Sequence, residues 1–126
     1  MILNRILSLR KNRLTRLRKL NTSIDARRSE LYAKLSECND LITQVTVDKK
    51  VYCDSLSATN TVLLFEYQKK NSLFDGRRQQ LIEDKKKINE EILRLSEKID
   101  RLRIDIFNVN KSIEKITYSL KENYFE

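Results

Sequence analysis

The sequence predicts an all-α protein in which two long helices form an intramolecular antiparallel coiled-coil hairpin. Three observations lead to this fold class: a seven-residue apolar repeat that occurs twice, a polar stretch between the two repeats, and a near absence of turn-forming residues. The chain of 126 residues has one glycine and no proline. Because a sheet protein of this size needs several tight turns built from these two residue types, all-β and doubly wound α/β folds are close to excluded.

The first helix is expected at about residues 2–53. Positions that alternate in steps of four and three from Leu3 are apolar at ten of thirteen places, which is the pattern of a coiled-coil helix with one apolar face. The polar exceptions are Arg10, Asn21 and Arg28. Polar residues at such positions commonly fix the register of a coiled coil at some cost in stability.

The turn is expected at about residues 54–62, in a stretch rich in Ser, Thr, Asp and Asn. These residues favour helix caps and turns over helix interiors. The rival turn is Asp75-Gly76, because an Asp-Gly pair is a strong helix breaker.

The register of the two repeats helps to choose between these turns. Facing residues of an antiparallel hairpin have numbers with a constant sum, and the repeats allow sums of 116, 123 and 151. The first two place the turn near residue 58 or near residues 61–62, and both stay open. The third turns at Gly76 and leaves the apolar face of the first two dozen residues in water, which forfeits roughly 1.5–3 kcal/mol per large side chain. The central turn is therefore preferred.

The second helix is expected at about residues 63–123, so that residues 1–126 form a single hairpin. From Leu81 onward the same spacing gives apolar residues at eleven of thirteen places, and Lys85 is a polar exception inside this repeat. Gly76 then lies within the helix, where it costs on the order of 1 kcal/mol relative to Ala. Helices of this length span roughly 80 Å, so the expected molecule is a lever, spacer, axle or docking surface without a thick core.

The composition argues against an enzyme. The chain has no histidine, so it cannot form a Ser/His or Cys/His nucleophile pair or use an imidazole as acid, base or metal ligand. One glycine cannot build a phosphate-cradling loop. Neither a cofactor nor a metal ion is expected.

The net charge of +8 is concentrated at one end of the chain. Residues 1–28 contain nine basic side chains and a single acidic one, Asp25, whereas residues 29–126 contain 17 of each sign. This asymmetry predicts a polyanionic or acidic partner for the first segment. All but one of the candidate binding residues lie outside the apolar face, and Arg10 lies on it: Arg5, Arg10, Lys11, Arg13, Arg16, Arg18 and Lys19.

Aromatic side chains gather near the turn and at the carboxyl end. Near the turn they are Tyr52, Phe65, Tyr67 and Phe74. Of these four, Phe65 lies off the apolar face and has either a local packing role or a docking role. At the carboxyl end, Tyr118, Tyr124 and Phe125 are expected to fold back on the Leu-rich start of the chain or to contact a partner.

Two cysteines, Cys38 and Cys53, are too few for a disulfide framework and suggest reduced thiols in the cytosol. No stretch approaches the roughly 20 apolar residues of a membrane span. An Arg-rich, acid-poor start is also typical of a mitochondrial presequence, but the apolar repeat that begins there continues far beyond a removable leader.

The chain resembles the central stalk proteins of type III secretion systems, the YscO/EscO/SsaO group, which are related to flagellar FliJ, and it looks most similar to the EscO type. The resemblance covers the whole chain. It rests on the Leu/Arg-rich start MILNRILSLRKNRLTRLRKL, the polar midpoint, the stretch LLFEYQKKNSLF followed by RRQQL, and the aromatic tail ENYFE.

The resemblance implies a non-enzymatic cytoplasmic protein at the secretion apparatus of a bacterium. Members insert one end of the hairpin into the pore of the hexameric secretion ATPase, promote its assembly and activity, and link it to the export gate. By resemblance, the basic terminal end with Tyr124 and Phe125 would face the ATPase, and the aromatic group near the turn would face the gate. Export chaperones are possible further partners, the membrane is reached only through the apparatus, and the free chain is expected to be a monomer.

Two other functions compatible with these residues stay open. A generic coiled-coil adaptor or export-chaperone scaffold would dimerise in trans. A binder of nucleic acid or of an anionic membrane would use residues 1–28, although a DNA-facing basic helix has no need of an apolar row running through it.

Overall fold

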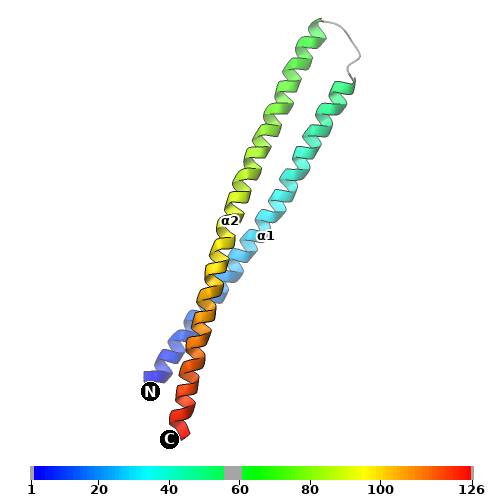
Figure 1. The fold of residues 1–126 in the computed structure, drawn as a ribbon. Coiled ribbons are helices and arrows are strands. Elements are labelled where there is room, and N and C mark those ends of the chain that lie inside the picture. Colours follow the sequence, from blue (N-terminus) through cyan, green and yellow to red (C-terminus); the bar gives the residue numbers. More distant parts are fainter. Residues whose placement is uncertain (1, 56–60, 126) are drawn as a thin grey trace. The chain divides into compact units, whose positions relative to one another are not determined.

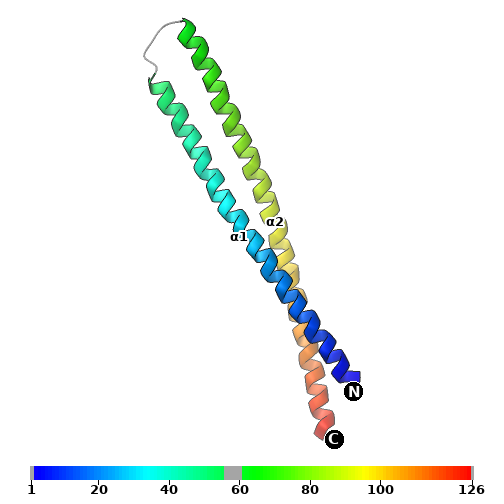
Figure 2. The ribbon, with the colours of Figure 1, turned by 180° about the vertical axis from the view of Figure 1, so that it is seen from behind.

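The computed structural model describes residues 2–55 and 61–125, with side chains described for 2–55 and 64–122. It contains two helices, α1 (Ile2–Ser55) and α2 (Thr61–Phe125), and no strand within these residues. The two helices run antiparallel and pack against each other, which confirms the predicted fold class (Figures 1 and 2). The helix α1 ends two residues later than the sequence suggested, and α2 begins two residues earlier and ends two residues later. Residues 56–60, in the middle of the predicted turn, lie outside the described residues.

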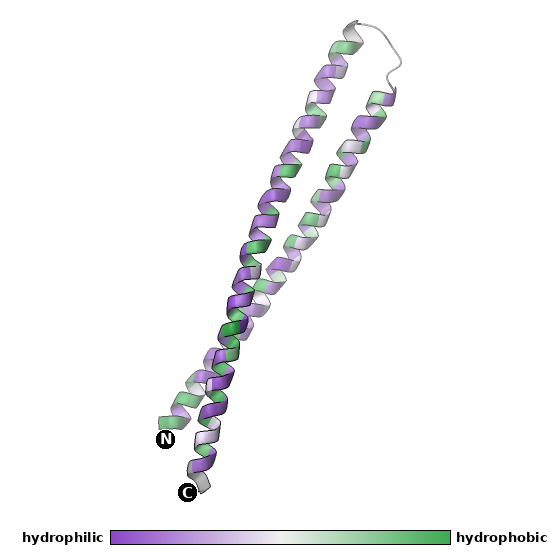
Figure 3. Ribbon diagram, in the orientation of Figure 1, coloured by the Kyte–Doolittle hydropathy of each residue, from purple (hydrophilic) through white to green (hydrophobic). Residues whose placement is uncertain are grey.

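The helix–helix packing divides into two compact units. Unit 1 combines Met1–Ser29 of the chain with Leu93–Glu126, and unit 2 is Glu30–Ile92. Each unit therefore contains one segment of α1 and one antiparallel segment of α2. Bands of apolar residues alternate with polar ones along both helices, as expected when each helix has one apolar face (Figure 3).

The core of unit 1 is a single layer of aliphatic side chains. Leu14 of α1 and Ile99, Leu102 and Val109 of α2 are buried. Arg28 lies at one end of this layer and links the two helices. One of its guanidinium nitrogens donates to Ser96 Oγ of α2 at 3.3 Å, and another donates to Asp25 Oδ1 of α1 at 2.8 Å.

Unit 2 buries Leu31, Cys38 and Val45 of α1 together with Ile92 of α2. The Cys38 thiol donates to the backbone carbonyl of Leu81 at 3.1 Å. Because the thiol reaches the backbone of α2 directly, the small side chain at Cys38 allows the two helices to approach each other there.

The cross-helix contacts identify the register. Three polar pairs, Arg28–Ser96, Lys49–Asp75 and Cys53–Asn71, have residue numbers with the same sum, 124. This value lies next to 123 and is far from 116, so the observed register is the one with the sum 123, although α1 ends at Ser55 and Thr61 already belongs to α2. In this register Leu14 faces Val109 and Leu31 faces Ile92, and all four of these side chains are buried.

The turn at Gly76 does not occur, because Gly76 lies inside α2. Its φ angle is not positive, and a Cβ atom placed on it would meet no atom within 4 Å. Nothing in the packing of α2 therefore requires glycine at this position.

We expect Gly76→Ala to raise the free energy of unfolding by about 1 kcal/mol, because alanine loses less backbone entropy in a helix and finds open space here. Denaturant unfolding followed by circular dichroism measures the change. A lower stability of Gly76→Ala would contradict the helical placement of this residue.

Asn21 is a polar residue in the apolar layer of unit 1. Its side-chain oxygen Oδ1 is buried and has no hydrogen-bond partner. In the observed register Asn21 faces Leu102, which cannot supply one. We expect Asn21→Leu to stabilise the protein by about 1–3 kcal/mol, since it removes the desolvation cost of an unpaired polar atom.

The matched control is Asn12→Leu, because Asn12 is exposed on the same helix. This substitution should change the free energy of unfolding by less than about 0.5 kcal/mol. Equal effects of the two substitutions would show that general helix propensity, and not the buried oxygen, controls the result.

Candidate partner-binding surfaces

Unit 1 carries the predicted basic residues on the outer faces of α1. Six of the seven are exposed, and we call these six the basic surface: Arg5, Lys11, Arg13, Arg16, Arg18 and Lys19. No ion pair joins any of them to a carboxylate among the described residues. Their charges are therefore not neutralised by the described residues and are available to an acidic partner.

The basic surface is separated from the apolar layer by the helical period of α1. Leu14 is buried and Leu7 and Leu17 are half-buried, so these residues mark the side of α1 that faces α2. Arg10 lies on that side and is half-buried. Its aliphatic stem can cover the layer while its guanidinium reaches water, which distinguishes it from the six exposed residues.

The single acidic residue of this segment is already engaged. Asp25 accepts from Arg28 at 2.8 Å, and this arginine also spans the helix pair to Ser96. Asp25 thus neutralises a side chain that holds the two helices together, and it does not offset the charge of the basic surface.

The surface of α1 in this region has only shallow depressions among the described residues. Two open depressions lie between its side chains, one lined by Thr15, Arg18, Lys19 and Thr22, and the other by Leu9, Asn12, Thr15 and Arg16. Such depressions suit contact with a broad protein surface better than enclosure of a small substrate. Among the residues that the structure describes, no group of three or more Cys, Asp or Glu side chains could hold a metal ion.

Three of the four predicted aromatic residues form one cluster in unit 2. The Tyr52 ring stacks on Tyr67 with ring centroids 6.2 Å apart, and it lies 6.0 Å from Phe74 in a tilted arrangement. The ammonium of Lys70 lies 4.8 Å from the centroid of the Tyr52 ring. This aromatic cluster joins the two helices, so its first role is to hold them together.

Polar contacts surround the aromatic cluster. Cys53 Sγ lies 3.5 Å from Tyr67 Oη and 3.6 Å from Asn71 Oδ1. Lys49 donates to Asp75 Oδ1 at 2.7 Å, and this hydrogen bond raises the pKa of Lys49 above its ordinary value of 10.5. The contribution of the pair is therefore present at neutral pH and is lost as the pH rises through the raised pKa of Lys49.

Phe65 is separate from the cluster. Its side chain is 69% exposed and lies near Leu73, which is 66% exposed. Gln68, Lys69 and Ser72 complete a shallow depression between them on one face of α2. Of the four aromatic residues predicted near the turn, Phe65 is the one whose ring is free to contact a partner without opening the helix pair.

Of the carboxyl-terminal aromatic residues, Tyr118 differs from the expectation that it folds back. Tyr118 is 65% exposed on α2, because its position in the helical period points away from α1. This side chain therefore does not cover the Leu-rich start of the chain. Tyr124 and Phe125 belong to the last turn of α2, but their side chains lie outside the described residues.

Sequence reasoning missed one feature of unit 1, a second apolar row on α2. Its members are Leu93, Ile104, Phe107 and Tyr118, which are each between 57% and 65% exposed. The signal in the sequence was an eleven-residue spacing, from Leu93 to Ile104 and from Phe107 to Tyr118. A search for seven-residue repeats passes over this spacing, although eleven residues close three helical turns almost as well.

The described part of the chain contains no helix that is long and apolar enough to cross a membrane. Comparison of the chain with models of known protein families gave no match, and comparisons with curated proteins and with solved structures gave none either.

We expect Phe74→Ala to destabilise the protein by about 1–3 kcal/mol, because the substitution removes a half-buried ring from the aromatic cluster. Phe65→Ala removes the same ring from an exposed position and should change the free energy of unfolding by less than about 0.5 kcal/mol. Thermal and denaturant unfolding of both variants measures the difference. Similar losses in the two variants would mean that Phe65 also supports the helix pair.

Proposed function

We propose that this protein is a non-enzymatic central stalk of a type III secretion export apparatus. In this role one end of the hairpin inserts into the pore of the hexameric secretion ATPase, stimulates its assembly and activity, and links it to the export gate at the cytoplasmic face of the apparatus. The proposal joins the family resemblance of the sequence to one structural observation, the basic surface of α1, whose side chains form no ion pair with the carboxylates that the structure describes.

The basic surface suits a partner that surrounds it. Its side chains extend to several sides of α1 and leave only the side that packs on α2. A single stalk inside a sixfold ring is a symmetry mismatch, so it cannot form one fixed interface with every subunit. Long Arg and Lys side chains meet acidic groups on successive subunits without such an interface, and these contacts should weaken as the salt concentration rises.

The gate contact is assigned to unit 2. Phe65 with Leu73 offers an exposed apolar patch on α2, while Tyr52, Tyr67 and Phe74 hold the helices beneath it. An exposed aromatic ring beside an aliphatic side chain is a common anchor at protein interfaces. The proposed contact with the gate is therefore centred on Phe65.

The alternative functions differ in what the basic surface would bind. A nucleic-acid or membrane binder would use the same side chains, but the apolar row of α1 is engaged by α2 and cannot enter a lipid surface while the helices remain paired. We therefore favour a protein partner.

The test is stimulation of the cognate hexameric ATPase by the purified chain. Charge reversal of Arg13, Arg16 and Arg18 to Glu should reduce the stimulation at least about tenfold and leave the helicity unchanged, because these side chains are exposed and form no ion pair with the carboxylates of the described residues. The matched control reverses Lys86, Lys87 and Arg94, which are exposed on α2 and change the net charge equally. This control should retain most of the stimulation.

Full stimulation by the first variant would exclude the basic surface as the ATPase contact. Duplex DNA and vesicles with anionic lipid serve as further arms of the same assay. Binding of the unaltered chain to either at physiological salt, without any effect on the ATPase, would favour the alternative function.

A further inference from the structure

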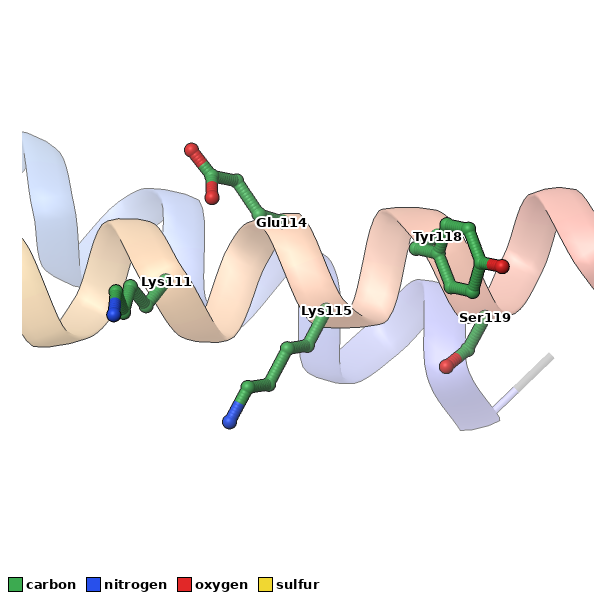
Figure 4. A pocket seen from close by; sticks show the side chains of 5 residues that line it. All are labelled: Lys111, Glu114, Lys115, Tyr118 and Ser119. Atoms are coloured by element: carbon green, nitrogen blue, oxygen red, sulfur yellow. The ribbon is translucent and has the colours of Figure 1, made fainter.

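The second apolar row of α2 lies on the side of this helix that faces away from α1. At about 100° per residue, Leu93, Ile104, Phe107 and Tyr118 fall within about 60° of one another around the helix axis. The buried residues Ile99 and Leu102 fall on the other side of α2. In Figure 4, Lys111 and Tyr118 project from α2 with the ribbon of α1 behind it.

Single exposed apolar side chains are common on protein surfaces and need no explanation. The spacing of this row is less common, because the intervals of eleven, three and eleven residues are the same in both directions. Leu93 and Tyr118 lie at equal distances from the midpoint of the row, and Ile104 and Phe107 do so as well. An antiparallel second copy of α2 would thus place Leu93 opposite Tyr118 and Ile104 opposite Phe107.

The charges in and beside the row follow the same symmetry. Asp100 and Lys111 lie on the row at equal distances from its midpoint, so each would face the opposite charge of a second copy. Glu97 and Lys115 lie on the same flank of the row, and their distances from its midpoint differ by one residue. Each would therefore also lie close to the opposite charge of a second copy. A two-fold interface requires this self-complementarity, since the same patch serves both copies.

The local surface also fits this arrangement. A shallow depression between Lys111, Glu114, Lys115, Tyr118 and Ser119 lies toward one end of the row (Figure 4). In the antiparallel arrangement Leu93 of the second copy lies opposite this depression. The ammonium of Lys111 lies 5.0 Å from the centroid of the Phe107 ring, which places this charge at the surface of the row, within reach of a facing Asp100.

We propose that unit 1 binds a second copy of this chain, antiparallel and two-fold symmetric, through the second apolar row of α2. The interface is small by the standard of stable dimers, so the pairing is weak and depends on concentration. It goes beyond the stalk function and departs from the monomer expected for the free chain. It uses α2 alone and leaves the basic surface of α1 uncovered.

Sedimentation equilibrium of the full chain tests the pairing. We expect the mass to rise from that of a monomer to that of a dimer as the concentration increases toward about 1 mM, the range of weak specific association. Ile104→Glu with Phe107→Glu should weaken the association at least about tenfold, because it places four carboxylates at the centre of the interface. A monomer over the whole range for the unaltered chain would overturn the proposal.

The matched control likewise replaces one aromatic and one aliphatic residue, in unit 2. Phe65→Glu with Leu73→Glu alters an exposed patch of unit 2 and should leave the association unchanged. Circular dichroism checks that each variant keeps its helicity. Equal weakening by both pairs of substitutions would overturn the proposal, since nonspecific hydrophobic association of exposed apolar residues would then explain the result.

Charge exchange tests the antiparallel arrangement. Asp100→Lys alone and Lys111→Asp alone each create two like-charge contacts and should weaken the dimer about threefold to tenfold. The double variant Asp100→Lys with Lys111→Asp restores the opposite charges and should recover the original affinity. Failure of the double variant to recover would overturn the pairing of these two residues and with it the proposed symmetry.

All three sets of variants leave Arg13, Arg16 and Arg18 in place. Their effect on association can therefore be separated from any effect on the ATPase. Loss of ATPase stimulation with intact self-association, or the reverse, distinguishes a failure of one proposal from a failure of the other.

Discussion

Burial of one apolar row of α1 against one apolar row of α2 is the interaction on which every other contact depends. Neither unit has a second layer of core, so no other element can compensate when this row is interrupted. The buried set in each unit is small, with Leu14, Ile99, Leu102 and Val109 in unit 1. The helices are long relative to their buried area, and their stability comes from repetition of the same contact along the chain and not from a few large side chains.

The polar residues of this packing surface select the register and do not add to its strength. Arg28 spans the helices to Ser96, and Cys38 reaches the carbonyl of Leu81. A shift by one heptad would keep most of the apolar residues opposite one another, but it would separate these polar partners. Asn21 has an unpaired oxygen in the same layer, so it carries the cost of a polar residue without a visible bond.

The fold class and the position of the helices could be predicted because the repeat is long and the chain nearly lacks turn formers. The choice between the sums 116 and 123 could not be made from the sequence, since both place apolar residues opposite apolar residues. Only the geometry of polar pairs such as Lys49–Asp75 separates them. The exposure of the basic residues followed from the period of α1, whereas the burial of Tyr52 against Tyr67 depended on the register and was out of reach. The row from Leu93 to Tyr118 was missed because its spacing is eleven residues and not seven.

The thiol contact of Cys38 gives unit 2 a property of its own. Cys38 is 5% exposed and its sulfur lies between the helices, whereas Cys53 is only half-buried. A thiol reagent can reach the first sulfur only after the two helix segments separate, but the second requires much less opening. The relative modification rates of these two cysteines therefore record how often, and from which end, the helices of unit 2 come apart.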